Sequence, residues 1–189
     1  MTMDIETRVI NNVHVPVLMC ICVNNRVMKH RFYDKDNWMN DMANAFKTLL
    51  RRKYNYKKIY VHNLSNFDAI FIIDVLSSIG DVRIIKRGGR ILSLDFTGKI
   101  INKNGKESKI NLTFRDSMLL LSGSLDNLSK SFDVRDKKTT FPLLFLNDEN
   151  VSLKYIGEVP DYKFFPKAGT SSFTKEDYLK YCMKFKYRK

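Results

Sequence analysis

The sequence is poor in cysteine and histidine and has no long apolar run, and each shortage excludes a class of protein. Its 3 cysteines are an odd number and too few for a disulfide framework, so Cys20 and Cys22 are interpreted as small apolar core residues. The 3 histidines have no spacing that would bind zinc together with them. No apolar stretch approaches the ~20 residues that span a bilayer. An acidic start stands where a signal peptide would be basic and then apolar. These absences predict a soluble protein.

Basic residues are abundant instead. The 189 residues include 33 Lys or Arg against 20 Asp or Glu, a formal net charge of +13. Such a balance suits a polyanionic partner, because each cation that meets a phosphate releases a counterion. A basic chain can also coat an anionic membrane or simply stay soluble. With 44% apolar residues the chain can build one core, and the charge favours nucleic acid as the partner.

Alternating and helical apolar patterns predict a mixed α/β fold. Met3 and Ile5 alternate with polar neighbours, and Asn24-Asn25 separates two β-branched runs as a hairpin turn would. Residues 174–177 resemble an N-terminal helix cap. The predicted strands are 1–7, 13–23, 26–33, 58–62, 82–86, 90–96, 99–101 and 109–114; the predicted helices are 36–53, 67–79, 125–132 and 175–186, with a loop-rich stretch at 137–173. We therefore expect one domain over residues 1–189, a mixed central sheet with flanking helices.

The first segment that could carry chemistry is Thr2-Met3-Asp4-Ile5-Glu6-Thr7. On a strand, Asp4 and Glu6 are two residues apart and point the same way, so their carboxylates can converge on one site. Hard oxygen ligands suit Mg²⁺ or Mn²⁺, and two such ions can activate water against a phosphodiester. D-x-E is also a common pattern, and a solvated strand face explains it equally well.

The second segment is 60–68, in which a buried strand runs through a polar turn into an apolar helix. Asp68 near the helix start would favour the helix dipole, and simple capping would explain it. A strand end is also where α/β proteins place reacting groups. Asn63 offers an amide there, and Phe67 offers a ring on which a base can stack.

Together these segments resemble family-B DNA polymerases. Asp4-Ile5-Glu6-Thr7 resembles their first exonuclease motif, D-x-E-T, and Asn63-x-x-x-Phe67-Asp68 resembles their second, N-x-x-x-(F/Y)-D, about sixty residues later. The flanking residues are similar to the protein-primed branch of mitochondrial linear plasmids and some phages. Residues 115–121 resemble that branch's single-strand-binding S-L motif, with methionine in place of leucine. Residues 137–142 resemble its K-x-x-apolar segment, so the likeness covers nearly the whole chain.

The resemblance implies a ribonuclease-H-like 3′→5′ exonuclease that proofreads single-stranded primer ends by two-metal hydrolysis. It implies that Asp4, Glu6 and Asp68 ligate Mg²⁺ or Mn²⁺, that Thr7, Asn63, Phe67, Ser117 and Met118 hold the primer 3′ terminus, that Lys138 contacts the scissile region, and that Tyr181 orients the attacking water. A terminal protein would assist the full-length polymerase, no membrane would be involved, and the protein would be mitochondrial or else viral, in the host cytoplasm. A turn residue at Ser117 and an ordinary surface lysine at Lys138 remain alternative interpretations.

The third exonuclease motif departs from the family pattern, Y-x-x-x-D. Here Tyr181 is followed four residues later by Phe185. Asp177 lies eight residues before Phe185, ~12 Å along a helix. Because phenylalanine binds no metal, we expect weak metal binding and impaired activity. A disturbed reading frame just before this point would also explain the change.

No motif of the polymerase reaction itself occurs, so the sequence is interpreted as a fragment. Three hypotheses follow: an exonuclease domain, a non-catalytic single-stranded-DNA-binding remnant, and a basic α/β module unrelated to polymerases. Cleavage separates the first two, and the position of Asp68 relative to Asp4 and Glu6 tests the third.

Overall fold

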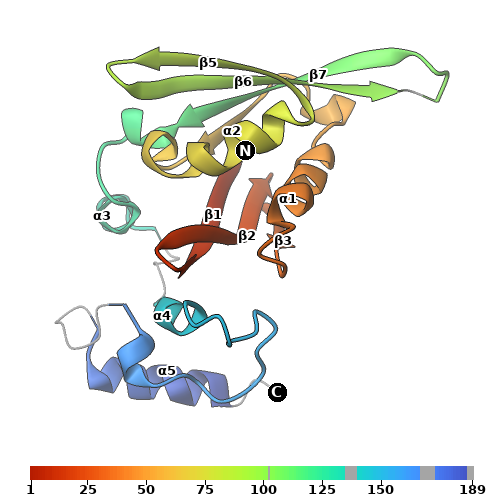
Figure 1. The fold of residues 1–189 in the computed structure, drawn as a ribbon. Helices are drawn as coiled ribbons and strands as arrows, with labels where there is room; N and C mark the ends of the chain where they lie inside the picture. Colours follow the sequence, from red (N-terminus) through yellow and green to blue (C-terminus); the bar gives the residue numbers. More distant parts are fainter. Residues whose placement is uncertain (102, 135–139, 167–172, 187–189) are drawn as a thin grey trace.

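A computed structural model describes residues 1–101, 103–134, 140–166 and 173–186 (Figure 1). Seven strands form one mixed sheet in the order β3-β2-β1-β4-β7-β6-β5. Neighbours β1 and β4, and β4 and β7, run parallel, whereas the other pairs are antiparallel. The strands are β1 (Thr2–Ile10), β2 (Val13–Val23), β3 (Arg26–Arg31), β4 (Lys57–Val61), β5 (Gly80–Arg87), β6 (Arg90–Ile101) and β7 (Glu107–Asp116).

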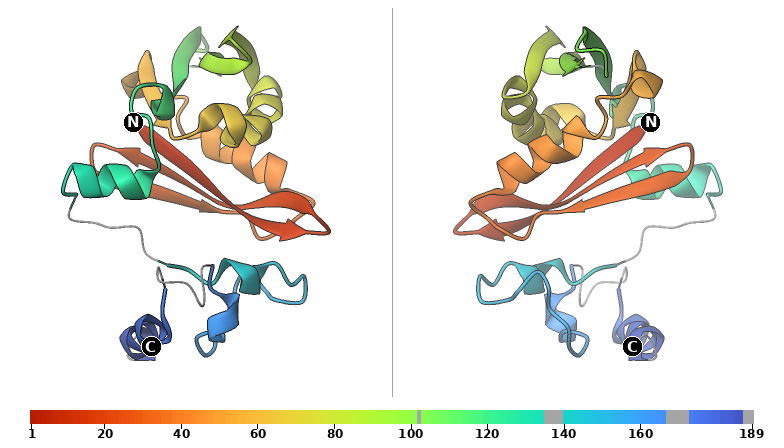
Figure 2. Two further views of the ribbon diagram at one scale, coloured as in Figure 1. Left: turned by 90° about the vertical axis from the view of Figure 1, so that its left-hand side faces the viewer. Right: turned by 90° about the vertical axis from the view of Figure 1, so that its right-hand side faces the viewer.

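The helices α1 and α2 cover one face of this sheet. Met42 and Phe46 of α1 and Ile72 of α2 are fully buried and belong to the core that the strands build with them. Figure 2 shows the two helices on the same side of β1–β3. No described helix is long and apolar enough to cross a membrane. The helices are α1 (Trp38–Lys47), α2 (Asp68–Ser77), α3 (Leu125–Ser131), α4 (Leu143–Leu146) and α5 (Lys175–Lys186), with 3-10 turns η1 (Arg52–Tyr54), η2 (Leu64–Asn66), η3 (Ser117–Leu119) and η4 (Tyr162–Phe164).

Side-chain alternation along β1 decides which residues reach the site. Met3 and Ile5 are each 4% exposed and pack into the core, whereas Asp4 and Glu6 point to the opposite, exposed face. Burying each apolar side chain stabilises the fold by roughly 1.5–3 kcal/mol, so a shift of one residue would lose both contacts at once. The core therefore fixes the direction of the two carboxylates.

The mixed α/β prediction is confirmed, with changes at several boundaries. The predicted helix 36–53 ends at Lys47, because Leu49 enters the core from the turn that follows rather than from a helix. The predicted strands 90–96 and 99–101 are one strand, β6. Gly98 does not interrupt that strand; a side chain there would collide with Leu50. Cys20 and Cys22 are half-buried on the face opposite the core, so their interpretation as core residues was wrong.

Aromatic residues of the described segments 140–166 and 173–186 form a smaller cluster of their own. Phe165 and Phe173 are buried there, with ring centroids 5.1 Å apart. The stretch predicted to be loop-rich contains α4 and η4. It contacts the end of the β1–β2 hairpin, where the backbone N–H of Val9 donates to Oδ1 of Asn147 over 2.9 Å. Every view places α5 at the end of the molecule opposite β5 and β6 (Figures 1 and 2).

The predicted cap of α5 is present. The backbone N–H of Asp177 donates to Oγ1 of Thr174 over 3.2 Å, and the N–H of Thr174 donates to the Asp177 carboxylate over 2.9 Å. The backbone N–H and the hydroxyl of Thr174 both donate to the Asp177 carboxylate, and these two bonds lower the pKa of Asp177. We expect Thr174→Ala to destabilise the first turn of α5 by about 1 kcal/mol. Amide hydrogen exchange at residues 175–178 should accelerate while exchange in α1 stays unchanged; acceleration throughout would contradict a local cap.

Candidate active site

The end of β4 brings the two acidic segments together. Strands β1 and β4 are parallel, and Met3 pairs with Val61, the last residue of β4. Asp4 therefore lies one residue past this pair, next to the point where the chain leaves the sheet. Asp68 begins α2 a few residues later. Open α/β sheets place ligands at this carboxyl edge of parallel strands.

Asp68 is a buried carboxyl group with an oxygen that has no hydrogen-bond partner. Its side chain is 2% exposed, and Oδ1 is unpartnered. Burial and, after it, the charge of Asp4 raise the pKa of Asp68 from its ordinary value of 3.8 to about 7. Backbone N–H groups of Asp68 and Ile5 act in the opposite direction but do not offset these effects. The groups around Asp68 therefore do not offset the negative charge that its carboxyl group carries when ionised.

The side chains of Asp4 and Glu6 lie near each other on the sheet face opposite the core, and the charges of both affect Cys20. Cys20 is the partner of Asp4 on β2. Burial raises the pKa of the Cys20 thiol; Lys29 lowers it, and the charges of Asp4 and Glu6 both raise it. The sequence-based prediction that these two carboxylates share one face is therefore confirmed.

A β-bulge follows Glu6 and redirects the chain at Thr7. Glu6 pairs with Leu18 and Thr7 with Pro16, so β2 contributes one extra residue between them. Proline fits this point of an inner strand because the ladder is already interrupted. The Thr7 hydroxyl lies 2.9 Å from Nδ1 of His14 across the hairpin.

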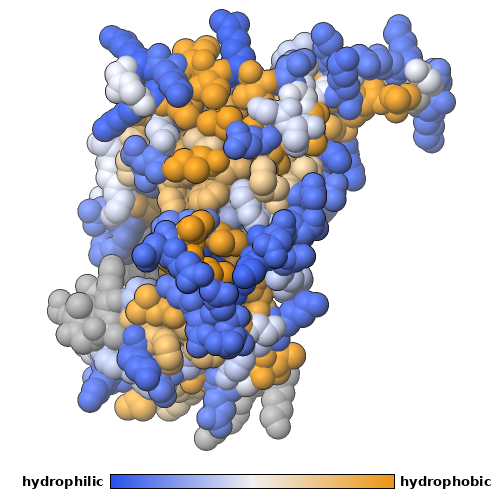
Figure 3. All heavy atoms as spheres, viewed as in Figure 1, coloured by the Kyte–Doolittle hydropathy of each residue, from blue (hydrophilic) through white to orange (hydrophobic). Residues whose placement is uncertain are grey.

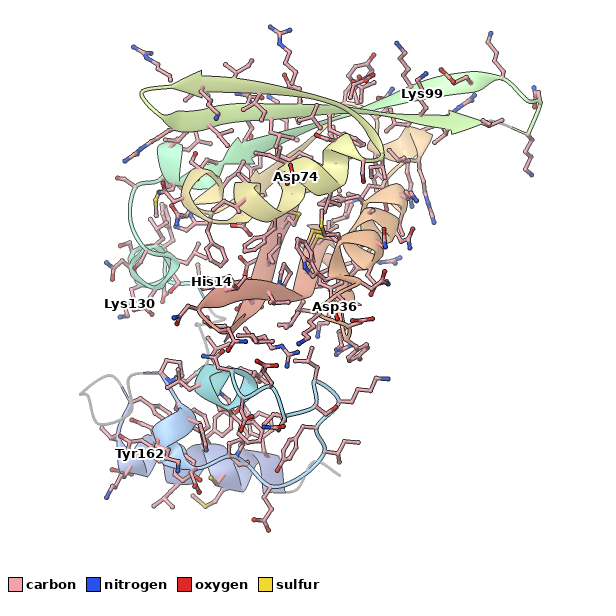
Figure 4. All side chains as sticks on the ribbon, in the orientation of Figure 1. His14, Asp36, Asp74, Lys99, Lys130 and Tyr162 are labelled. Atoms are coloured by element: carbon pink, nitrogen blue, oxygen red, sulfur yellow. The ribbon has the colours of Figure 1, made fainter. Side chains whose placement is uncertain are left out.

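His14 contacts both Thr7 and the aromatic ring of Phe67. Its ring meets Phe67 edge-on with centroids 5.5 Å apart, and Phe67 in turn meets Phe71 at 5.4 Å. Figure 4 shows His14 on the hairpin formed by β1 and β2. Two residues predicted to bind single-stranded DNA, Thr7 and Phe67, are thus linked through a residue that the sequence did not single out.

The buried side chain of Asp116 holds the second acidic segment in place. It is 4% exposed at the end of β7. Its Oδ1 accepts hydrogen bonds from the backbone N–H groups of Asn63 and Met118, each 3.0 Å away, and Oδ2 accepts from Ser65 at 3.1 Å. Asn63 has a left-handed φ of 64°, which lets the chain turn sharply after β4. Asp116 therefore ties the 63–65 turn to residues 117–118.

Ser117 lies beside His62 in the same region. Nε2 of His62 donates to the carbonyl oxygen of Gly123 over 2.9 Å. Its other ring nitrogen, Nδ1, lies 3.1 Å from the Ser117 hydroxyl. The backbone thus brings Ser117 and Met118 to the turn that holds Asn63.

Tyr181 lies apart from the carboxylates of Asp4, Glu6 and Asp68. Its ring packs against Phe165 at 5.0 Å and Phe185 at 4.5 Å within the C-terminal aromatic cluster, and burial raises its pKa. Figure 4 labels Tyr162 of the same cluster, on the far side of the β1–β2 hairpin from α2. Lys138 lies outside the described residues.

The site fits a divalent cation only in part. In the described portion of the chain, no group of three or more His, Cys, Asp or Glu is arranged to hold a metal ion. Asp68 nevertheless presents an unpartnered buried oxygen close to the charge of Asp4. Carboxylate oxygens are the ligands that Mg²⁺ and Mn²⁺ prefer. The donor chemistry therefore fits, but the ligand set is incomplete.

Sequence reasoning missed the roles of Asp116 and His14. Asp116 stands directly before Ser117, and an aspartate at a strand end is a common turn residue. His14 faces Thr7 only because the β1–β2 hairpin turns at Asn11 and Asn12, both of which have positive φ. Recognising that Asn-Asn pair as a hairpin turn would have paired His14 with Val9 and so placed it diagonally from Thr7.

Comparisons with known proteins identify a family for this chain. The family described as DNA polymerase type B, organellar and viral, matches residues 48–189. A probable DNA polymerase of Ascobolus immersus is 44% identical over 185 residues, 97% of this chain and 15% of the relative. One from Neurospora intermedia is 40% identical over 201 residues, covering 98% of this chain and 20% of the relative.

A third probable DNA polymerase, from Agaricus bitorquis, is 34% identical over 116 residues, 61% of this chain and 13% of the relative. No solved structure matches. The chain thus spans a small part of the length of these relatives. The family match covers three quarters of the chain, and this chain belongs to the type B DNA polymerases of organelles and viruses.

Proposed function

We propose that this chain is the proofreading 3′→5′ exonuclease part of such a polymerase, with impaired turnover. The observation that carries the proposal is the buried Asp68 carboxyl group beside the charge of Asp4, at the carboxyl end of β4. A buried carboxyl group with a second carboxylate nearby is stabilised in its charged form by a cation. The mixed sheet with flanking helices is consistent with a ribonuclease-H-like exonuclease fold.

In this proposal, Asp4, Glu6 and Asp68 hold Mg²⁺ or Mn²⁺. Bound there, the ions would supply the polarised phosphodiester and the activated water of two-metal hydrolysis. The reaction adds water across the terminal P–O3′ bond and leaves a nucleoside 5′-phosphate and a strand with a free 3′-hydroxyl. The protein's own contribution is to hold the strand so that this bond lies over the carboxylates.

Residues around the carboxylates suit that positioning. Phe67 offers a ring against which the terminal base can stack, and His14 and Phe71 fix its orientation. Thr7 and Ser117 offer hydroxyl groups, and Asn63 offers an amide. Met118 provides an apolar contact, and we propose Lys138, outside the described residues, as the cation beside the scissile phosphate.

A second candidate function is binding of single-stranded DNA without cleavage. It is favoured by the position of Tyr181, which packs with Phe165 and Phe185 and not with the carboxylates. Phe185 cannot ligate a metal. The same aromatic and polar groups would then bind a DNA end that the protein does not hydrolyse.

Cleavage of a 3′-labelled single-stranded oligonucleotide in Mn²⁺ separates the two functions. We expect slow release of mononucleotides from the wild type and a further loss of about 100-fold in Asp4→Asn. Phe185→Asp should not restore the rate, because residue 185 packs in the C-terminal aromatic cluster and not beside the carboxylates. Glu176→Gln, an exposed change on α5, is the matched control and should leave the rate unchanged.

Binding of the same oligonucleotide without any cleavage, in the wild type and in Phe185→Asp, would favour the second function. Cleavage that is equally fast in Asp4→Asn would contradict the proposed site altogether.

We further propose a mitochondrial source, with a virus as the alternative, and a terminal protein as partner of the full-length polymerase. The organellar and viral family supports the proposed source, and the resemblance to protein-primed polymerases is the reason for proposing a terminal protein.

A further inference from the structure

A second cluster of charge lies at the opposite end of β4 from the carboxylates. Three segments meet there: η1 with the residue before it, the start of β4, and the turn between β6 and β7. Segments 51–58 and 99–109 contain nine Lys or Arg and a single acid, Glu107. The cations are all exposed: Arg51, Arg52, Lys53, Lys57, Lys58, Lys99, Lys103, Lys106 and Lys109.

These segments are joined by specific contacts. The backbone N–H of Tyr56 donates to the carbonyl oxygen of Asn111 over 2.7 Å, and the N–H of Asn111 donates to Oδ1 of Asn55 over 2.8 Å. Side chains of η1 and of the β6–β7 turn line one open hollow, formed by Arg52, Lys103, Asn104 and Lys106. Figure 3 shows hydrophilic side chains crowded over this corner, and Figure 4 labels Lys99 within it.

The sheet holds like charges opposite one another at this corner. Lys99 on β6 is the direct cross-strand partner of Lys109 on β7. Like charges in this position destabilise a sheet. Glu107 pairs with Lys99 at 3.2 Å, but one acid does not balance the group. Local electrostatics alone therefore disfavour this arrangement, and an anionic ligand would stabilise it.

The backbone conformation of Tyr56 is a second, independent indication of a ligand at this corner. Its φ is +61°, and it follows Asn55 with φ −57° and ψ 136°, the angles of a type II turn. That turn position favours glycine, and a bulky residue with positive φ is an outlier. The Tyr56 side chain is 78% exposed and so gains little from packing. Strained, exposed residues of this kind cluster at ligand-binding surfaces.

We propose that Tyr56 and the surrounding cations form a platform for single-stranded DNA. Exposed cations contact the phosphate backbone, and a base stacks on the Tyr56 ring. A duplex keeps its bases stacked inside and would use only the cations. Asp4 lies one residue past the Met3–Val61 pair, six residues along the strand direction from Tyr56. At roughly 3.3 Å per residue the platform lies about 20 Å from Asp4, and a strand bound there need not touch the carboxylates. The inference does not depend on the exonuclease being active.

Fluorescence anisotropy with a labelled oligo(dT) of about 12 nucleotides, in EDTA, tests the platform. We expect Tyr56→Gly to weaken binding by about tenfold, while its Tm stays unchanged or rises because glycine fits the turn. Tyr56→Phe keeps the ring and should bind within about twofold of the wild type. If Tyr56→Gly fails to fold, Tyr56→Asn serves the same purpose, because asparagine tolerates positive φ.

The contribution of the cations is tested separately, by measuring how the affinity for oligo(dT) depends on salt concentration. Lys109→Gln should lower the slope of log affinity against log salt by about one unit. Arg26→Gln, an exposed cation at the β2–β3 turn, should leave it unchanged. Unchanged affinity in Tyr56→Gly, equal loss for a duplex of the same length, or tighter binding to anionic lipid vesicles than to oligo(dT) would each overturn the proposal.

Discussion

Replacing Asp68 by asparagine is expected to stabilise the metal-free protein above about pH 7, by roughly 2 to 4 kcal/mol of unfolding free energy. Burial and the charge of Asp4 raise the pKa of Asp68 from 3.8 to about 7 in the fold. The folded protein therefore holds this proton more tightly than the unfolded chain does. Wild-type stability should fall as pH rises from about 4 to about 7, and the penalty is complete above that range.

Chemical denaturation of wild type and Asp68→Asn, at about pH 5 and about pH 8, measures this difference. The stabilisation by Asp68→Asn should be larger at the higher pH. Asp74→Asn, on an exposed position of α2, is the control for a general charge effect. If Asp68→Asn is equally destabilising at both pH values, the carboxylate is a simple structural group and the account of the site is wrong.

Replacing Asp116 by alanine is expected to destabilise the fold by about 3 kcal/mol. The change leaves the backbone N–H groups of Asn63, Ser65 and Met118 without their acceptor in a buried position. Loss of these bonds also releases the turn between β4 and α2, which orients Asp68. Thermal unfolding measures the stability, and hydrogen exchange at 63–65 measures the local opening.

Asp116→Asn is the matched variant. Its side-chain oxygen can still accept from Asn63 and Met118, whereas its amide would face the N–H of Ser65. The expected loss is therefore smaller, about 1 to 2 kcal/mol, and hydrogen exchange should increase at Ser65 first. A stable Asp116→Ala variant with unchanged exchange would show that the three bonds do not hold the turn.

Local patterns were enough to predict much of the fold. Asn24-Asn25 marked a hairpin because asparagine tolerates the positive φ that such turns need, and both residues have it. The cap at Thr174 was readable because its side chain and that of Asp177 act on neighbouring backbone groups. Features that depend on residues close in sequence were accessible without the structure.

Long-range features were not accessible in the same way. That Asp4 reaches Asp68 depends on the parallel pairing of β1 with β4, which links residues far apart in the chain. Motif order and the family resemblance indicated this proximity, but alternation alone did not. The position of Tyr181 depends on how the C-terminal aromatic cluster packs, and no local pattern encodes it.

Mn²⁺ binding to the intact chain tests the central claim most directly. Electron paramagnetic resonance of free Mn²⁺ during a titration reports uptake without requiring catalysis. We expect saturable uptake by the wild type, a loss of affinity of about 10- to 100-fold in Asp4→Asn and in Asp68→Asn, and no loss in Glu176→Gln. Titration curves that are the same for all four proteins would contradict a cation site at Asp4, Glu6 and Asp68.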